Sequence, residues 1–415
     1  MTAIPRDGTL DGMPALLAEG YRFIPERCRR LGTDIFETRL MLRRAVCVQG
    51  PEAARMFYTP GRFTRRGALP PSTLRLLQDH GSAATLDGEA HRWRKALFLS
   101  LMAPAGLGRL ADLMEQEWRA RILDWQGRDR VVLLEEVRAI LCRAVCRWAG
   151  VPLTESAADA RAAEFGAMIE GAGSAGPRAL RGLLLRARTE RWARRLVAEV
   201  REGRVRTPDD RALHRIAWHR DPAGRLLDVR VAAVELINLL RPTVAVDRFV
   251  VFAALALHQH PEYRRGVEAD DEALTRFVQE VRRFYPFFPL VGGRVLEPFE
   301  WRGVRFERGA WVILDLHGTN HDPRAWSEPG RFRPERFLGW RGDPFTLVPQ
   351  GGGDHRTGHR CPGEWATIEI MRRAVRLLAT AMRYEVPEQD LRVDLSRMPA
   401  VPRSRFVIAN VRPTA

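Results

Sequence analysis

The feature that most constrains this chain is an apolar stretch with helical periodicity at Val229–Leu257, which is long enough to cross a membrane. The charged residues that interrupt it are Glu235, Arg241, Asp247 and Arg248. Because charges inside a membrane span are costly, we expect no such span here. Asp228 is suited to cap the start of the helix, and a proline pattern ends it shortly after His258. The sequence therefore predicts a long helix in the interior of the protein.

Helical periodicity also dominates the rest of the chain. Helix patterns cover residues 91–102, 110–125, 134–150, 273–285 and 362–382. Residues 40–50 have the pattern of a strand, residues 292–314 that of short β-hairpins, and a proline-rich coil fills residues 322–349. No internal repeat or linker divides the sequence. We therefore expect a mainly α fold with a small β portion, formed as a single domain over residues 1–415.

The N-terminus and the cysteines favour a reducing compartment. The first residues, MTAIPRDGTLDGMPALL, lack the basic segment and apolar run of a signal peptide. Five cysteines are an odd number and too few for a disulfide framework in 415 residues, so we predict a cytoplasmic protein. Cys142 and Cys146 lie four residues apart on one predicted helix face. We favour two small core residues there, with half of a metal site as the alternative.

Arginine carries almost all of the positive charge behind the net charge of +16, since Lys95 is the single lysine. The arginines are scattered along the chain and no nucleic-acid-binding module is recognisable, so we expect no nucleic-acid partner. One local run, Arg178–Arg195, predicts a basic helix. The apolar residues on one of its faces are Leu180, Leu183, Leu184 and Ala187. We favour a solvated outer face for this helix. Contact with an anionic membrane surface and guidance of acidic ligands are the alternatives.

The stretch DHRTGHRCPGEWATIEI places Cys361 just before a predicted helix. Pro362 suits the first helical position, and a helix N-terminus favours negative charge. His359 and Arg360 add positive potential, so we expect a lowered thiol pKa and a thiolate able to bind a metal. The glycines that would let this backbone pass close to a flat, bulky group are Gly351, Gly352, Gly353, Gly358 and Gly363. These features suit haem iron, whose macrocycle supplies the other donors, although the motif alone also fits a catalytic or an inert cysteine.

Two further motifs precede this cysteine. The stretch EVRR places Glu280 and Arg283 on one helix face, and PERF follows at residues 334–337. In this order and at these separations, the three motifs resemble the cytochrome P450 superfamily over essentially the whole chain. The resemblance implies a helical fold with a long central helix over haem b and Cys361 as the axial ligand of the iron. It also implies a buried network of Glu280, Arg283 and Arg336 behind the haem.

The cysteine loop departs from the usual superfamily pattern, which has Phe seven residues and Gly four residues before the cysteine. Those two positions hold Asp354 and Thr357. The loop GGGDHRTGHRCPGE is instead similar to that of the fatty-acid peroxygenase branch, a group of enzymes that oxidise fatty acids with hydrogen peroxide.

Arg241 and Pro242 stand where the long helix of ordinary P450 monooxygenases carries an acid followed by an alcohol. Neither side chain donates a proton usefully near pH 7. The proline should kink the helix, because it removes the hydrogen bond to the carbonyl of Asn238. The Arg-Pro pair matches the peroxygenase branch, in which the arginine holds the carboxylate of a fatty acid. Taken alone, Arg241 could instead pair with Glu235 or Asp247, or be exposed.

The resemblance implies a substrate-assisted reaction that needs no redox partner. The carboxylate held by Arg241 acts as general acid–base, and oxidation falls on the carbons nearest to it. We expect 2- or 3-hydroxylation, with decarboxylation to a terminal alkene as a further outcome. Ala84 stands where members of the branch carry His or Gln, and it offers no hydrogen bond. The alternatives are a partner-dependent P450 monooxygenase acting on an acidic substrate and a haem-binding sensor or carrier.

Several further residues take roles by the same resemblance. His91 and Lys95 share a helix face and match groups that bind haem propionates, with a surface salt bridge as the alternative. His359 and Arg65 match further propionate contacts. The residues expected to line the acyl tunnel are Phe287 and Phe288, although ordinary core aromatics would have the same pattern.

Overall fold

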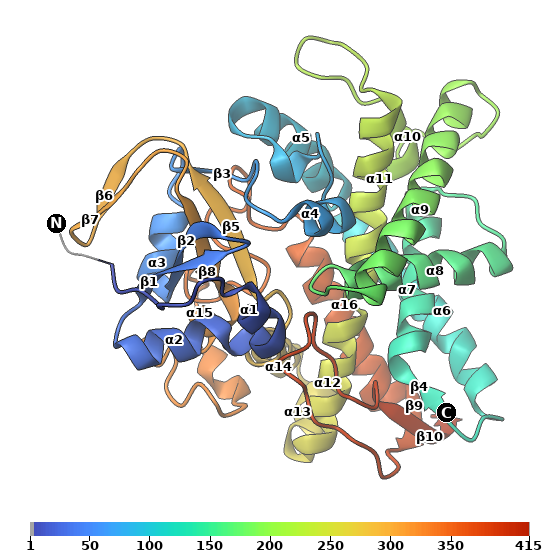
Figure 1. Ribbon diagram of the computed structural model, residues 1–415. Coiled ribbons are helices and arrows are strands. Elements are labelled where there is room, and N and C mark those ends of the chain that lie inside the picture. The colour runs from blue at the N-terminus through green and yellow to red at the C-terminus, as the bar shows by residue number, and fades with distance from the viewer. Residues whose placement is uncertain (1–3, 415) are drawn as a thin grey trace.

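The computed structural model describes residues 4–414 (Figure 1). A sheet and its short helices lie on one side of the molecule, and a larger group of helices lies on the other. The α-helices of the described chain are α1 (Met13–Glu19), α2 (Phe23–Leu31), α3 (Pro51–Phe57), α4 (Pro71–Leu77), α5 (Gly88–Leu101), α6 (Pro104–Trp125), α7 (Leu133–Ala149), α8 (Glu155–Gly171), α9 (Pro177–Arg201), α10 (Ala212–Ala217), α11 (Val229–Val244), α12 (Asp247–Gln259), α13 (Arg264–Ala269), α14 (Asp271–Phe284), α15 (Leu316–Asn320) and α16 (Glu364–Arg376). The prediction of a mainly α fold with a small β portion is confirmed.

Short helical turns connect several of these elements. They are η1 (Gly20–Arg22), η2 (Ala83–Thr85), η3 (Pro261–Tyr263), η4 (Pro334–Phe337) and the π-helical turn η5 (Leu377–Ala381). No single helix in residues 4–414 has the length and hydropathy expected of a membrane span. Helices α5 and α6 meet these two criteria only when they are counted as a pair, and they are bent by 55° relative to each other.

The strands form three small sheets. They are β1 (Ile35–Leu40), β2 (Arg43–Gln49), β3 (Phe63–Thr64), β4 (Val131–Val132), β5 (Leu290–Val295), β6 (Phe299–Trp301), β7 (Val304–Phe306), β8 (Trp311–Asp315), β9 (Met382–Glu385) and β10 (Val407–Pro413). The largest sheet has the order β1-β2-β8-β5-β3, in which β2 and β8 are parallel and the other pairs antiparallel. This sheet joins residues near the N-terminus to residues near 310, so segments far apart in the sequence build one layer.

The helical side contains the main hydrophobic core, and α7 runs through its centre. Leu133, Ile140 and Val145 of α7 are fully buried, as expected for a helix covered on all sides. Cys142 and Cys146 are also buried there, and the sulfur of Cys142 lies 3.6 Å from the carbonyl of Ala158. This placement agrees with two small core residues rather than with half of a metal site.

The long apolar stretch forms two consecutive helices, α11 and α12. The carboxylate of Asp228 accepts a hydrogen bond from the amide of Arg230 at 2.7 Å and caps α11 as predicted. Pro242 lies inside α11, and the helix ends at Val244, two residues further on. Pro242 has no amide hydrogen to donate to the carbonyl of Asn238, one turn earlier, and α11 nevertheless continues past it. A turn of two residues then separates α11 from α12, which begins at Asp247.

Several predicted boundaries need correction. The last long helix begins at Glu364 rather than Pro362, because Cys361 to Gly363 form a turn before it. The predicted strand at 40–50 is the second arm of a hairpin whose first arm, β1, was missed. Residues 292–314 contain the short β6–β7 hairpin, but their flanks, β5 and β8, pair with each other inside the large sheet.

Candidate functional site

The loop before α16 presents Cys361 from a tight backbone path. Gly351 and Gly353 have φ angles of +89° and +79°, which favour glycine. A β-carbon on Gly352 would lie 2.5 Å from the carbonyl oxygen of Pro344, so no side chain fits there. The amide of Cys361 donates to the carbonyl of Gln350 at 3.2 Å, which fixes the cysteine at the end of this loop.

The predicted lowering of the Cys361 pKa is wrong for the protein alone. Burial of the thiol raises its pKa, and the nearby carboxylate of Glu364 raises it further. The amide of Gly363 and the charges of Lys95 and Arg282 act in the opposite direction but do not outweigh burial. A buried thiol of this kind needs a cation beside it to become a thiolate, and a metal ion supplies that charge.

Sequence reasoning missed Glu364 and Gln350 beside the cysteine. Glu364 is 1% exposed and accepts hydrogen bonds from Arg360 at 2.5 and 3.1 Å and from Arg282. The side-chain amide of Gln350 lies 3.8 Å from the sulfur of Cys361 and donates to Thr367 at 3.0 Å. Glu364 directly follows the Cys-Pro-Gly motif, so the sequence could have indicated that it lies beside the cysteine. No sequence pattern indicates the same for Gln350.

Basic side chains gather on one side of the cysteine loop. His91 of α5 faces His359 with 4.0 Å between the ring centroids. Lys95, one turn further along α5, donates to the carbonyl of Arg360 at 2.7 Å and to that of Gly358. Lys95 and His91 are 2% and 5% exposed, which contradicts the alternative of a surface salt bridge.

Arg65 belongs to the same basic group through its position after β3. Its guanidinium is buried and donates to the carbonyl of Gly292 at 2.6 Å. The carboxylate of Asp87 lies 3.9 Å from the Nε2 atom of His359, and its Oδ1 atom has no hydrogen-bond partner among the described residues.

Burial is the leading cause of the unusual pKa values in this basic group. It lowers the pKa of His91 to about 4, that of His359 to about 2 and that of Lys95 to about 8. The positive charges of the group add to these shifts, because Lys95 lowers the pKa of both histidines. Such a cluster of desolvated donors would be stabilised by anionic groups placed between them.

The chemistry of this donor set fits haem. Cys361 offers one soft ligand, and the described residues contain no cluster of three or more His, Cys, Asp or Glu side chains that could hold a metal without a macrocycle. The basic group beside the loop suits the two carboxylates of a haem. The glycines of the loop allow the close backbone approach that a flat ring requires.

Arg241 lies near the C-terminal end of α11 and is buried at 6% exposure. Its Nη2 atom donates to the carbonyl of Leu77 at 2.5 Å, and its Nε atom has no partner among the described residues. Its pKa is lowered to about 9, chiefly by burial and also by the charge of Arg186, while Cys361 acts in the opposite direction. Arg241 therefore lies within electrostatic reach of the cysteine.

The carboxylates proposed as alternative partners of Arg241 are engaged elsewhere. Glu235 accepts from Arg94 at 2.8 Å and from the amide of Ala83 at 2.7 Å. Asp247 pairs with Arg138 at 2.9 Å and with Arg248 at 2.8 Å. Within residues 4–414, Arg241 therefore forms no ion pair, which is unusual for a buried guanidinium.

The carbonyl groups that end α4 are bound to α11. The side-chain amide of Asn238 donates to Gln78 at 2.7 Å, one turn before the bond from Arg241 to Leu77. Asp79, which follows, lies 3.5 Å from the Nη2 atom of Arg186 of α9. Contacts of these side chains thus connect α4 with both α9 and α11, and the three helices lie close together in Figure 1.

The three residues predicted to contact substrate occupy different surroundings. Ala84 lies in η2, which the bond from Ala83 to Glu235 ties to α11. The ring of Phe287 stacks on Phe249 of α12 at 4.1 Å between centroids. Phe288 is 41% exposed and packs edge-on against Phe287.

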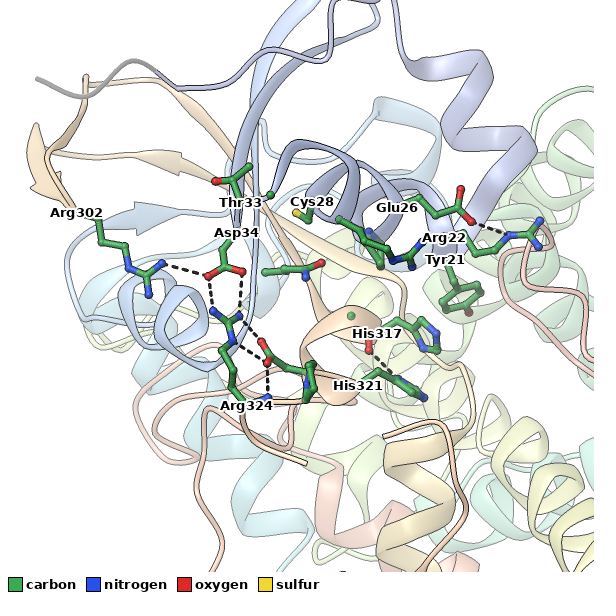
Figure 2. A pocket seen from close by; sticks show the side chains of 17 residues that line it. Tyr21, Arg22, Glu26, Cys28, Thr33, Asp34, Arg302, His317, His321 and Arg324 are labelled. Atoms are coloured by element: carbon green, nitrogen blue, oxygen red, sulfur yellow. Dashed lines mark hydrogen bonds and ion pairs between the residues drawn. The ribbon is translucent and has the colours of Figure 1, made fainter. Parts of the chain in front are cut away.

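A polar groove of about 770 Å³ lies on the sheet side of the molecule, and none of the residues that line it is a predicted site residue (Figure 2). Asp34 at its edge binds Arg324 at 2.5 and 2.9 Å and Arg302 at 3.2 Å. Its floor includes Tyr21, whose hydroxyl donates to the carbonyl of Phe287 at 2.5 Å. The groove is therefore connected to the backbone at Phe287, but it contains none of the side chains assigned to the site.

The predicted Glu-Arg-Arg network is present in the structure as a set of contacts. Glu280 accepts from Arg283 at 2.7 and 2.8 Å and from Arg336 at 3.1 Å. The amide of Arg333 donates to the same carboxylate at 2.8 Å. Since Glu280 and Arg283 are fully buried, this network fixes η4 against α14.

Fold and site together define a helical haem enzyme with one soft sulfur ligand, and comparisons with known proteins agree. A sequence profile of the family described as Cytochrome P450 matches residues 272–379. A Synechocystis sp. protein described as cytochrome P450 120 is 25% identical over 400 residues, which cover 88% of this chain and 87% of that protein. The chain belongs to the cytochrome P450 family.

Solved structures of three P450 proteins are more similar still. Cytochrome P450SP alpha in complex with (R)-ibuprophen is 47% identical, with a TM-score of 0.94 over 97% of this chain and 99% of that one. Cytochrome P450EX alpha with myristic acid is 42% identical, with a TM-score of 0.97 over the whole of both chains. A variant of cytochrome P450 OleT with arachidonic acid is 36% identical, with a TM-score of 0.97 over 100% of this chain and 99% of that one.

Proposed function

We propose that this protein is a haem-thiolate peroxygenase that uses hydrogen peroxide to oxidise fatty acids close to the carboxylate. The observation that carries the proposal is the buried guanidinium of Arg241, which has no acidic partner within residues 4–414. An ionised carboxylate is the ligand that best satisfies such a group. Solved relatives with myristic acid and arachidonic acid support a fatty acid as its source.

Arg241 would bind and orient the substrate. Its Nε atom is free to donate, and a carboxylate at this guanidinium would form charge-assisted hydrogen bonds worth about 1.5–3 kcal/mol. The anion would also raise the pKa of Arg241 from its lowered value, because it compensates for burial. Holding the acid at one end leaves the carbons next to the carboxylate nearest to the reacting centre.

The same carboxylate would move the proton that the reaction needs. No acid–alcohol pair stands at positions 241 and 242, and the nearby acids Glu235 and Asp247 are held by arginines. The hydroxyl of Thr243 donates to the carbonyl of Leu239 at 2.9 Å and is occupied within α11. The substrate carboxylate is thus the general acid–base that this chain lacks at the site.

The haem would be haem b, and it supplies the iron chemistry that activates peroxide. We assign its axial ligand to Cys361 and its propionate contacts to His91, Lys95, His359 and Arg65. Pro242 breaks the helix beside the carboxylate, and Ala84, Phe287 and Phe288 line the acyl chain. The supporting residues behind the haem are Glu280, Arg283 and Arg336. Residues 1–415 would form a single P450 domain.

We expect 2- or 3-hydroxylation, with decarboxylation to a terminal alkene as a second outcome. Ala84 has no hydrogen-bonding group, so the product is set by the position of the acyl chain rather than by a second contact to the acid. The protein would work in the cytoplasm without a redox partner. Its five cysteines, all free, agree with a reducing compartment.

The decisive experiment incubates the haem-loaded protein with a chain-length series of saturated fatty acids and hydrogen peroxide, without reductase. Mass spectrometry should detect hydroxylated acids or the alkene shortened by one carbon. If product forms only when a reductase system and NAD(P)H replace peroxide, the protein is a partner-dependent monooxygenase and the proposal is wrong.

A further inference from the structure

The outward side of α9 forms a stripe that the oxidation chemistry does not explain. Its exposed members are Leu180, Arg181, Leu184, Ala187, Arg188, Arg191 and Arg195, which we call the α9 outer face. Steps of three or four residues place them on one side of the helix. The stripe runs along about four turns, or roughly 22 Å.

The two leucines of the α9 outer face belong to no core. Leu180 and Leu184 are 58% and 64% exposed and lie one turn apart. The same helix buries Leu196 and Val200 against the interior, so it has a separate packing face further along. Two large apolar side chains held together in water cost free energy and mark a surface that another apolar phase can cover.

Three of the four arginines of this face lack acidic partners. Arg181, Arg191 and Arg195 form no ion pair with any described residue, and Arg188 pairs with Glu164 at 3.1 Å. The carboxylate of Glu190 on the same helix points inward, where Arg186 binds it at 2.8 Å. An exposed arginine of α6, Arg119, differs in this respect, because it pairs with Glu115 at 2.8 Å. The α9 outer face is therefore positive with no acid among its members.

We propose that the α9 outer face binds the surface of a membrane that contains anionic lipids. Arginines attract the lipid phosphates, and leucines between them enter the boundary between head groups and acyl chains. A nucleic acid would engage the arginines but leave both leucines in water. This binding lies along the surface and requires no membrane span.

The α9 outer face also lies one layer from the proposed acyl site. On the inner side of α9, Arg186 contacts Asp79, which follows the α4 segment whose Leu77 carbonyl binds Arg241. Fatty acids partition into bilayers, so a docked α9 would bring the site close to its substrate. This delivery step rests on the proposed function, whereas the binding itself does not.

The test is co-sedimentation of the haem-loaded protein with vesicles of phosphatidylcholine alone and of phosphatidylcholine mixed with phosphatidylglycerol. We expect binding to the anionic vesicles only, weakening as salt rises. Arg181→Ala with Arg191→Ala should lower the partition coefficient about 25-fold, at about fivefold per arginine. Leu180→Ser with Leu184→Ser should lower it at least tenfold.

A matched control comes from the far end of α6. Arg119→Ala with Leu123→Ser removes a similar pair, since Leu123 is 62% exposed, and it should leave binding unchanged. Equal losses in both sets of variants would overturn the proposal, as would equal binding to neutral vesicles. Binding of wild type to duplex DNA but not to vesicles would also overturn it.

Turnover of a short fatty acid in vesicle-free buffer separates this proposal from the proposed function. The α9 variants should retain that turnover, because none of the altered residues belongs to the site. Vesicle binding by a wild-type protein that oxidises no fatty acid would leave the surface proposal standing and remove the peroxygenase assignment alone.

Discussion

At the scale of single residues, Arg241 and Cys361 are both buried, and each lacks a charge of a different sign beside it. Arg241 is a buried cation without an anion, and Cys361 is a buried thiol whose pKa is raised. A charge from outside the chain would relieve each of them, and we propose a carboxylate for Arg241 and a metal cation for Cys361. The identities of both residues followed from sequence motifs. The direction of the Cys361 pKa did not, because burial depends on distant segments.

Replacement of Arg241 by alanine tests whether this residue binds a carboxylate. We expect fatty-acid affinity, followed by the shift of the haem absorption band, to fall about 10- to 150-fold, which is the loss of about 1.5–3 kcal/mol. Haem content should be unchanged, and the melting temperature should not fall, because a buried charge is removed. The exposed Arg119→Ala is the control. Wild-type affinity in Arg241→Ala would refute the carboxylate role.

Replacement of Cys361 by alanine tests whether this residue binds the haem iron. The ferrous carbon monoxide complex should lose the absorption band that is characteristic of thiolate ligation, because no other described cysteine lies at the loop. Cys142→Ala, which alters a buried core cysteine of α7, should keep the band. A thiolate spectrum retained in Cys361→Ala would assign the ligand to another residue.

At the scale of elements, the contact between α14 and η4 depends on one carboxylate. Glu280→Ala should lower the free energy of unfolding by about 3–5 kcal/mol, because Arg283 would remain buried without its partner. Urea denaturation measures this loss. Glu272→Ala on the same helix is the control, since its pair with Arg276 at 3.5 Å is exposed and should contribute less than about 1 kcal/mol. Equal effects of the two changes would contradict a structural role for the network.

The junction of β8 and α15 gives the fold a pH dependence. Asp315 caps α15 through the amide of Gly318 at 2.7 Å, while its other oxygen and the side-chain oxygen of Gln49 are buried without partners. Burial raises the pKa of Asp315 from 3.8 to about 7. The folded protein therefore binds more protons than the unfolded chain between those values, and its stability falls as pH rises through that window.

Asp315→Asn should remove that dependence while keeping the cap. Each unit of the pKa difference corresponds to about 1.4 kcal/mol, so the loss of stability between about pH 4 and about pH 7 is measurable by urea denaturation. The variant should show a flatter profile, because asparagine does not titrate and its amide can donate toward Gln49. An unchanged slope would show that Asp315 is ionised throughout.

The elements themselves were largely predictable, and the misses have physical causes. Strong helical periodicity located α5, α6, α7 and α14, and the Asp228 cap was also correct. The strand β1 was missed because IFETRL gains its β structure from pairing with β2, which no local pattern reveals. The break between α11 and α12 falls after Val244 rather than at Pro242. The hydrogen bond that Pro242 cannot form belongs to the turn before it, so the proline did not predict the position of this break.

At the scale of the whole molecule, the site is assembled from segments far apart in sequence. Leu77, Arg241, Phe287 and Cys361 come from four regions, and no motif gave the contact between Leu77 and Arg241. The motifs identified the candidate functional residues, whereas the contact of α4 with Arg241 arises only when the helices pack together. A sequence pattern cannot predict such a contact, because every residue has a backbone carbonyl.

The last prediction concerns the source of the carboxylate that moves the proton. If the proton is moved by a carboxylate at Arg241 rather than by the protein, the acid need not be part of the oxidised molecule. A short carboxylic acid bound at Arg241 should therefore allow peroxide-driven oxidation of a small substrate that lacks an acid group, such as an aromatic hydrocarbon. Product should rise with the concentration of the added acid and saturate as the site fills. Arg241→Ala should abolish this dependence, and the corresponding short amide should not replace the acid, because it cannot exchange the proton. Oxidation that is equally fast without the added acid would locate the proton donor in the protein.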